Sequence, residues 1–231
     1  MYLAHNLPRC NLDSKRPSAI ELGSGIGFTA CVPFISAFTR TEMCASSLAL
    51  SSLGWDVLAT DIPHVIQSVL RSNVTNNLTA LPSGSGNVQV RELDWSVHPD
   101  NWTWDHESII ASPSLSEPPS APSSLHPSFD LIISADTVYA IELVNPFLRT
   151  LHALSLLSIS SARGPPIFLC IERRDPMVVD RLLSDAQNEW GFVVERIPQK
   201  KVAKALEKSG VHWGKSNWED IEIWKLRLLS L

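Results

Sequence analysis

The feature that most constrains the fold of this chain is the alternation of strand-length apolar runs with longer stretches of helical periodicity. Strands that alternate with crossover helices build a mostly parallel sheet, because a parallel connection has to cross one face of the sheet. We predict strands at Ser18–Leu22, Asp56–Thr60, Val88–Glu92, Phe129–Ser134, Pro166–Ile171, Phe192–Ile197 and Ile221–Leu228. The chain is therefore expected to be an α/β protein with a seven-stranded sheet.

Helical patterns fill the intervals between these strands. They lie at Phe28–Phe38, Glu42–Leu53, Pro63–Asn77, Leu143–Leu157 and Pro176–Trp190. Before the last strand the chain offers only a short basic helix and a glycine-containing loop, which favours an antiparallel strand pair at the C-terminal end of the sheet. We expect a Rossmann-like, seven-stranded, mostly parallel sheet with helices on both faces. At 231 residues, we expect it to form a single domain over residues 1–231.

The stretch "AIELGSGIGFTA" leads from the first strand into three glycines at alternate positions, Gly23, Gly25 and Gly27. In an open α/β sheet, ligands bind at the carboxyl ends of the strands, where the strand order reverses. Ser24 lacks the spacing of a nucleophile elbow, and no lysine follows as in a P-loop. Gly27 comes one residue early for a dinucleotide turn, and Glu21 would repel a pyrophosphate but attract an α-amino group. The pattern favours S-adenosylmethionine, which joins a nucleoside to an amino acid, over a turn that binds no ligand.

Carboxylates follow the second and third predicted strands. Asp61 ends "WDVLATD", where it could accept hydrogen bonds from ribose hydroxyls or cap the helix that begins near Pro63. Asp94 and Trp95 end "ELDW". The Asp94 carboxylate could accept from an adenine amino group while the Trp95 indole supplies an apolar face, although Trp95 could also be an ordinary core residue.

The fourth predicted strand ends in "FDLIISADTVY", which places Ala135, Asp136 and Tyr139 at the same edge of the sheet. An aspartate directly after a buried strand is costly unless it is solvated or paired, so Asp136 should lie at a rim or in a site. A helix cap is the alternative. Asp136 and Tyr139 would share one face if a helical turn began here.

In order along the chain, "ELGSGIG", "VLATD", "NVTNN", "LDW" and "DLIISADTVY" resemble the class I, seven-β-strand protein-lysine methyltransferases. Among these, the chain is most similar to the fungal enzymes that methylate translation elongation factor 1A. The resemblance covers roughly residue 18 to the C-terminus and implies an S-adenosylmethionine-dependent protein-lysine N-methyltransferase. The implied cofactor-binding residues are Glu21, Gly23, Ser24, Gly25, Asp61, Asp94, Trp95 and Ala135.

The same resemblance implies that Asp136 and Tyr139 are the catalytic residues. Asp136 would accept a hydrogen bond from the substrate amine, and Tyr139 would line the channel and contact the cationic head through its ring. Two other functions stay open. The chain could be a non-catalytic interaction protein that retains the fold, or a methyltransferase that acts on the nitrogen or oxygen of a small molecule.

Two segments depart from a compact α/β unit. Gly27 and Asp61 are 34 residues apart, whereas the acidic residue of a dinucleotide-type unit follows after about 20 residues. We therefore interpret residues 31–46 as an insertion, although the apolar residues of this segment are also typical of a helix face. Residues 98–128 contain a proline- and serine-rich stretch without periodicity, which predicts a mobile surface loop.

The composition argues against several other classes of protein. A net charge of −5 argues against direct nucleic-acid binding, and the sequence lacks the apolar run of about 18 residues that predicts a membrane span. The four cysteines and seven histidines show no metal-ligand spacing, so we expect no metal and a reducing interior. His98 and His106 are expected at the surface. We therefore expect a cytoplasmic protein. We also expect a monomer, and the resemblance implies that its partner is a protein substrate, elongation factor 1A.

Overall fold

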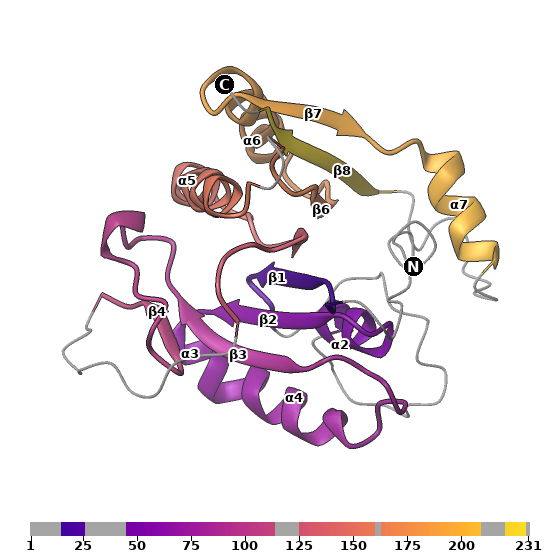
Figure 1. Cartoon of the computed structure of the whole chain (residues 1–231). Coiled ribbons are helices and arrows are strands. Elements are labelled where there is room, and N and C mark those ends of the chain that lie inside the picture. Colours follow the sequence, from indigo (N-terminus) through magenta and orange to yellow (C-terminus); the bar gives the residue numbers. More distant parts are fainter. Residues whose placement is uncertain (1–14, 26–44, 114–124, 160–162, 209–219, 230–231) are drawn as a thin grey trace.

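The structure, a computed structural model, describes residues 15–25, 45–113, 125–159, 163–208 and 220–229 (Figure 1). Its centre is an eight-stranded sheet with the strand order β4-β3-β2-β1-β5-β6-β8-β7. The strands are β1 (Ser18–Leu22), β2 (Asp56–Asp61), β3 (Val88–Leu93), β4 (Ile109–Ala111), β5 (Leu131–Ala135), β6 (Ile167–Glu172), β7 (Phe192–Arg196) and β8 (Ile221–Leu228). Neighbouring strands from β4 to β6 pair in parallel, and β8 pairs antiparallel with both β6 and β7.

The predicted α/β class, the mostly parallel sheet and the antiparallel C-terminal pair are therefore confirmed. The predicted number of strands was wrong, because β4 adds an eighth strand. It lies inside residues 98–128, which the sequence predicts as a loop. A short 3-10 turn, η2 (Pro99–Asn101), lies in the same segment, and residues 114–124 are outside the described residues.

Contacts that are distant in sequence hold β4 in place. Arg91 on β3 is fully buried, and its Nη2 donates to the carbonyls of Trp104 at 2.9 Å and His106 at 2.6 Å. His106 is buried rather than at the surface, and its Nδ1 accepts from the backbone N–H groups of Ser108 and Ile109 at 3.1 Å each. These bonds satisfy the backbone where β4 begins. A three-residue strand of this kind has no periodicity that a sequence pattern could detect.

Helices cover both faces of the sheet. They are α2 (Ala45–Ser52), α3 (Pro63–Val65), the π-helical turn η1 (Ile66–Leu70), α4 (Arg71–Leu78), α5 (Ile141–Leu157), α6 (Pro176–Asn188) and α7 (Gln199–Lys208). The helix predicted over residues 63–77 is present as the continuous run of α3, η1 and α4. The helix predicted over residues 28–38 lies outside the described residues. So does the segment interpreted as an insertion, residues 31–46, except that α2 includes Ala45 and Ser46.

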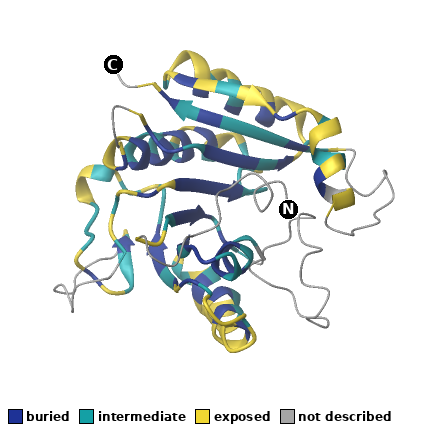
Figure 2. Cartoon of the chain, turned by 45° about the vertical axis from the view of Figure 1, so that its right-hand side comes forward, coloured by how far each residue is buried: buried dark blue, intermediate teal, exposed yellow. Residues whose placement is uncertain are grey.

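The period-two alternation along the strands divides the core into two layers. Ile20, Leu22 and Ile132 point to one face, where buried residues of α5 and α6 pack against them. Ala19 and Leu131 point to the other face, toward α2, η1 and α4. Figure 2 shows buried residues along the central strands and exposed residues on the outer surfaces of the helices. Within the described ranges, no helix is both long and apolar enough to cross a bilayer.

The strand order reverses beside β1. The chain runs from β1 outward through β2 to β4, and then returns to the opposite side of β1 with β5. At such a reversal the two connecting helices leave toward opposite faces, so a crevice opens above the carboxyl ends of the strands. The residues that follow β1, β2, β3 and β5 are therefore brought together at one edge.

Candidate functional site

A cavity of about 730 Å³ opens at this edge of the sheet. It brings together every residue that the sequence singled out for binding or catalysis. These are Glu21, Gly23, Ser24, Gly25, Asp61, Asp94, Trp95, Ala135, Asp136 and Tyr139. The cavity also has lining residues that the sequence analysis missed, namely Ile62, Val65, Leu93, Ser96, Thr137, Leu143, Pro146 and Arg174.

The glycine turn after β1 is a tight backbone structure that excludes side chains. Gly23 and Gly25 have φ values of +65° and +36°, in the region that favours glycine. A Cβ atom on Gly23 would lie 2.4 Å from Cγ2 of Thr137 and 3.4 Å from Cη2 of Trp95. The backbone of Gly25 donates to Oδ2 of Asp61 at 2.7 Å. The turn therefore needs glycine for both its conformation and its close packing.

Glu21 is a buried carboxylate, with 3% of its surface exposed. Its partners are hydroxyls, including that of Ser47 on α2, which donates to Oε2. Burial raises the pKa of Glu21 above its ordinary value, and the serine hydrogen bonds only partly oppose this effect. Among the described residues, no basic side chain forms an ion pair with it. A positively charged group of a ligand in the cavity would therefore be attracted to Glu21.

Asp61 receives a backbone N–H group on each carboxylate oxygen, from Gly25 at 2.7 Å and from Ile62 at 2.8 Å. Burial raises the pKa of Asp61, and these two hydrogen bonds oppose the rise. Each oxygen keeps a further lone pair that can accept a ligand hydroxyl. The alternative that Asp61 caps the next helix was wrong, because the N-cap of α3 is Ile62, which makes no side-chain capping bond, and Asp61 lies one residue before it.

Asp94 and Trp95 form the wall that follows β3. Asp94 Oδ1 accepts from the backbone N–H of Ser96 at 2.8 Å, which fixes the turn. The Trp95 ring packs on Phe147, with ring centroids 5.0 Å apart, and also lines the cavity. Core packing and cavity lining are thus both true of Trp95. Its indole Nε1 is buried without a hydrogen-bond partner among the described residues.

Asp136 and Tyr139 lie on the side of the cavity next to β5 and β6. Asp136 has a φ of +52°, and its Oδ2 forms an ion pair with Nη2 of Arg174 at 3.1 Å. Tyr139 is 78% exposed. No helical turn joins these two residues, because α5 begins only at Ile141, and its N-cap, Ala140, makes no side-chain capping bond. Asp136 is therefore not a helix cap.

Arg174 is the charged cavity residue that sequence reasoning missed. The signal was present in "IERRDP", where two arginines follow a buried strand directly. A charge at that position needs either solvent or a partner, as we inferred for Asp136. What the sequence did not reveal is that the partner of Arg174 would be Asp136 itself.

A fungal methyltransferase is similar in sequence to part of this chain. No family model matches the chain. Over 137 residues it is 28% identical to the protein-lysine N-methyltransferase rrg1 of Schizosaccharomyces pombe, a match that covers 59% of this chain and 34% of that protein. The chain is thus similar to a fungal protein-lysine methyltransferase, and it matches only about a third of that relative's length.

Two solved structures are similar to this chain over most of its length. A methyltransferase from Pyrococcus furiosus shares 14% identity, with 99% of this chain and 79% of that chain covered and a TM-score of 0.49. The N-terminal domain of human METTL16 in complex with SAH shares 12% identity, with 94% and 64% covered and a TM-score of 0.43.

Proposed function

We propose that this chain is an S-adenosylmethionine-dependent methyltransferase that acts on a lysine of a protein, and that the protein is translation elongation factor 1A. The observation that supports the proposal most is the cavity at the strand reversal, which gathers the glycine turn, the carboxylates of Glu21, Asp61 and Asp136, the Trp95 indole and the exposed Tyr139 in one place. The similarity to a fungal protein-lysine N-methyltransferase supports the reaction class.

On the β1–β2 side, the chain offers groups that fit the cofactor. Glu21 would attract the α-amino group, and the free lone pairs of Asp61 would accept from the ribose hydroxyls. The backbone of Gly23 and Gly25 would allow the methionine portion to approach closely, since no side chain intervenes. Asp94 and Trp95 would receive the adenine, by accepting from its amino group and by covering one of its faces.

On the β5–β6 side, the chain offers groups that fit an amine substrate. When bound, S-adenosylmethionine supplies a methyl group on a sulfonium centre, so the protein has mainly to position the amine and exclude water. The amine of lysine has an ordinary pKa of about 10.4 and has to lose a proton before transfer. Asp136 would orient the amine by accepting its hydrogen bond, and the exposed ring of Tyr139 would contact the cationic head.

The proposal is tested in two steps with the full chain. Isothermal titration calorimetry with S-adenosylmethionine and S-adenosylhomocysteine measures cofactor binding, and a chain that binds neither would be a non-catalytic protein. Incubation of fungal lysate with S-adenosylmethionine labelled on the methyl group then distinguishes a labelled protein band from labelled small molecules. Recombinant elongation factor 1A is the direct substrate, and mass spectrometry of the product identifies the modified residue.

A further inference from the structure

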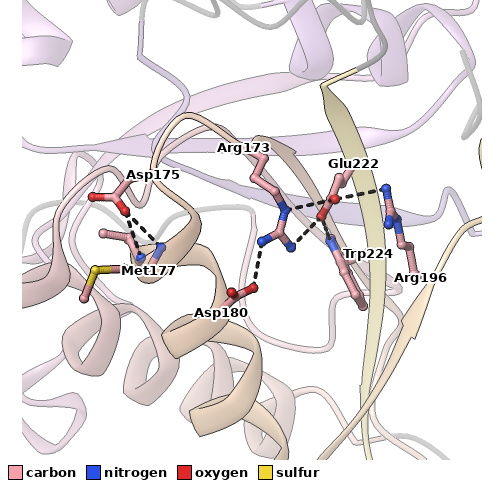
Figure 3. A network of polar contacts seen from close by, with 8 residues as sticks. Arg173, Asp175, Met177, Asp180, Arg196, Glu222 and Trp224 are labelled. Carbon is pink, nitrogen blue, oxygen red and sulfur yellow. Dashed lines mark hydrogen bonds and ion pairs between the residues drawn. The ribbon is translucent and has the colours of Figure 1, made fainter.

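Two consecutive arginines leave the end of β6, and their surroundings differ. Arg173 is anchored on three sides: Nε and Nη2 donate to the two carboxylate oxygens of Glu222 at 3.0 and 3.1 Å, and Nη1 donates to Asp180 at 2.7 Å (Figure 3). Arg174 lines the cavity instead, and 61% of its side chain is exposed. Its ion-pair partners among the described residues are Asp136 and Glu172.

The anchoring of Arg173 fixes the backbone from which Arg174 projects. Glu222 is buried and also receives Nη2 of Arg196 at 2.9 Å and the indole N–H of Trp224 at 2.8 Å. Burial acts to raise the pKa of Glu222, but the bonds from Arg173 and Trp224 and the charges of both arginines hold it below its ordinary value. The β6–α6 connection is therefore held firmly, while the Arg174 side chain stays at the surface.

The Arg174 guanidinium contacts both of its carboxylates through a single nitrogen atom. Nη2 lies 3.1 Å from Oδ2 of Asp136 and also pairs with Oε2 of Glu172. This is not the two-pronged geometry that makes an arginine–carboxylate pair strong. An exposed pair of this kind contributes little net free energy, because solvent screens it and a long side chain has to be ordered. A second cation could therefore displace Arg174 at low cost.

We infer that Arg174 is an internal competitor for the substrate, which occupies the Asp136 carboxylate until the cationic side chain of the substrate displaces it. The inference rests on the proposed function. Glu172 gives the displaced guanidinium a second partner, so Arg174 does not lose both of its contacts when Asp136 is released. Arg174 thereby sets a threshold for amine binding, and a cation without further contacts to the protein competes poorly. Arg174 is a specificity-determining residue in this scheme.

The first test needs neither the cofactor nor methyl transfer. Guanidinium chloride at sub-denaturing concentration and n-butylammonium chloride, a mimic of the lysine side chain, are titrated onto the full chain. The backbone amide resonances of Asp136 and Glu172 report binding. In Arg174→Ala the resonances should respond at about fivefold lower cation concentration than in the unsubstituted chain. This ratio corresponds to the loss of one exposed ion pair near the upper end of its usual strength.

Arg181→Ala is the matched control, because Arg181 is 63% exposed and forms a similar ion pair with Asp185 on the outside of α6. This variant should titrate like the unsubstituted chain, as should Arg174→Lys, which keeps the positive charge. Equal titration of Arg174→Ala and the unsubstituted chain would overturn the inference, and so would weaker binding in Arg174→Ala. This titration tests the role of Arg174 even if S-adenosylmethionine does not bind the chain. Failure of the cofactor to bind would refute only the proposed function.

The second test uses the reaction. In methylation of recombinant elongation factor 1A, Arg174→Ala should lower KM for the protein about fivefold and change kcat less, because Arg174 occupies the Asp136 carboxylate only in the free enzyme. Added guanidinium should then inhibit Arg174→Ala more strongly than the unsubstituted enzyme. A higher KM in Arg174→Ala would show that Arg174 binds the substrate directly, which contradicts competition.

Discussion

The two sides of the cavity hold their carboxylates in different ways. On the β1–β2 side, Glu21 and Asp61 are deeply placed, and their described partners are hydroxyls and backbone N–H groups. On the β5–β6 side, Asp136 and Glu172 both pair with Arg174, whose side chain is 61% exposed, although Oδ1 of Asp136 also accepts from the backbone N–H of Glu172 at 3.3 Å. Neutral, fixed donors preorganise a carboxylate for a ligand, whereas an exposed cation can be exchanged for another cation. We call the β1–β2 side the fixed side and the β5–β6 side the exchanging side. Under the proposed function, the fixed side would bind the cofactor and the exchanging side would bind the substrate.

The largest effect on cofactor binding is expected from Gly23→Val, which adds a side chain to the glycine turn on the fixed side. A side chain at a positive φ is strained by about 1–2 kcal/mol, and its Cβ would also lie 2.4 Å from Thr137. S-Adenosylmethionine binding should be lost in calorimetry. Gly84→Val is the matched control, because Gly84 also has a positive φ of +88° but its Cβ would meet no atom within 4 Å. Equal losses of binding in the two variants would show that the close contact at Gly23 does not matter.

The next effect is expected from Asp61→Ala. Loss of hydrogen bonds to a charged acceptor should weaken S-adenosylmethionine binding by about 1.5–3 kcal/mol. Calorimetry measures the change in Kd. Asp56→Ala is the control, because Asp56 accepts a similar backbone hydrogen bond from Asn87 at 2.8 Å but lies at the opposite end of β2. An unchanged Kd in Asp61→Ala would remove Asp61 from the cofactor site.

Glu21→Gln should affect the stability of the chain and its affinity for the cofactor in opposite directions, and the effect on stability should depend on pH. Burial raises the folded-state pKa of Glu21 above 4.5. Its contribution to stability is therefore fully present below the unfolded-state pKa and is lost as the pH rises through the folded-state pKa. Relative to the unsubstituted chain, Glu21→Gln should gain in Tm as the pH rises above 4.5, while cofactor affinity falls.

Thermal unfolding followed by circular dichroism across this pH range checks the stability part of that expectation. Glu195→Gln serves as the control for cofactor affinity, because Glu195 is exposed on β7 and does not line the cavity. A Tm difference for Glu21→Gln that is independent of pH would mean that Glu21 has the same pKa in the folded and unfolded chains.

The smallest effect on cofactor binding is expected from Asp136→Asn, on the exchanging side. This change keeps the shape of the side chain but removes its charge, so it should lower single-turnover methylation and leave the Kd for S-adenosylmethionine nearly unchanged. Tyr139→Phe tests the neighbouring ring, and it should lower the rate less, because the exposed ring face is retained. Equal losses of turnover and cofactor affinity in Asp136→Asn would place this residue on the cofactor side and end the distinction between the two sides.

The sequence by itself determined the longer strands of the sheet and the carboxylates and glycines of the cavity. Apolar runs placed the seven longer strands, and the parallel topology then brought the residues after β1, β2, β3 and β5 to one edge. This is why residues as distant in sequence as Glu21 and Tyr139 were predicted to line one site, and both do. Local signals were sufficient here, because periodicity and the position of a residue after its strand define an edge without any knowledge of side-chain contacts.

Only the tertiary structure decided how those side chains are paired. The close approach of Thr137 to Gly23, the contact of Arg174 with Asp136, and the burial of His106 beside Arg91 each join residues far apart in the chain. The strand β4 belongs to the same group, since its three residues are ordered by contacts with β3. No local pattern encodes such pairs, because whether a polar side chain meets solvent, a hydroxyl or a charge depends on which distant segments pack beside it.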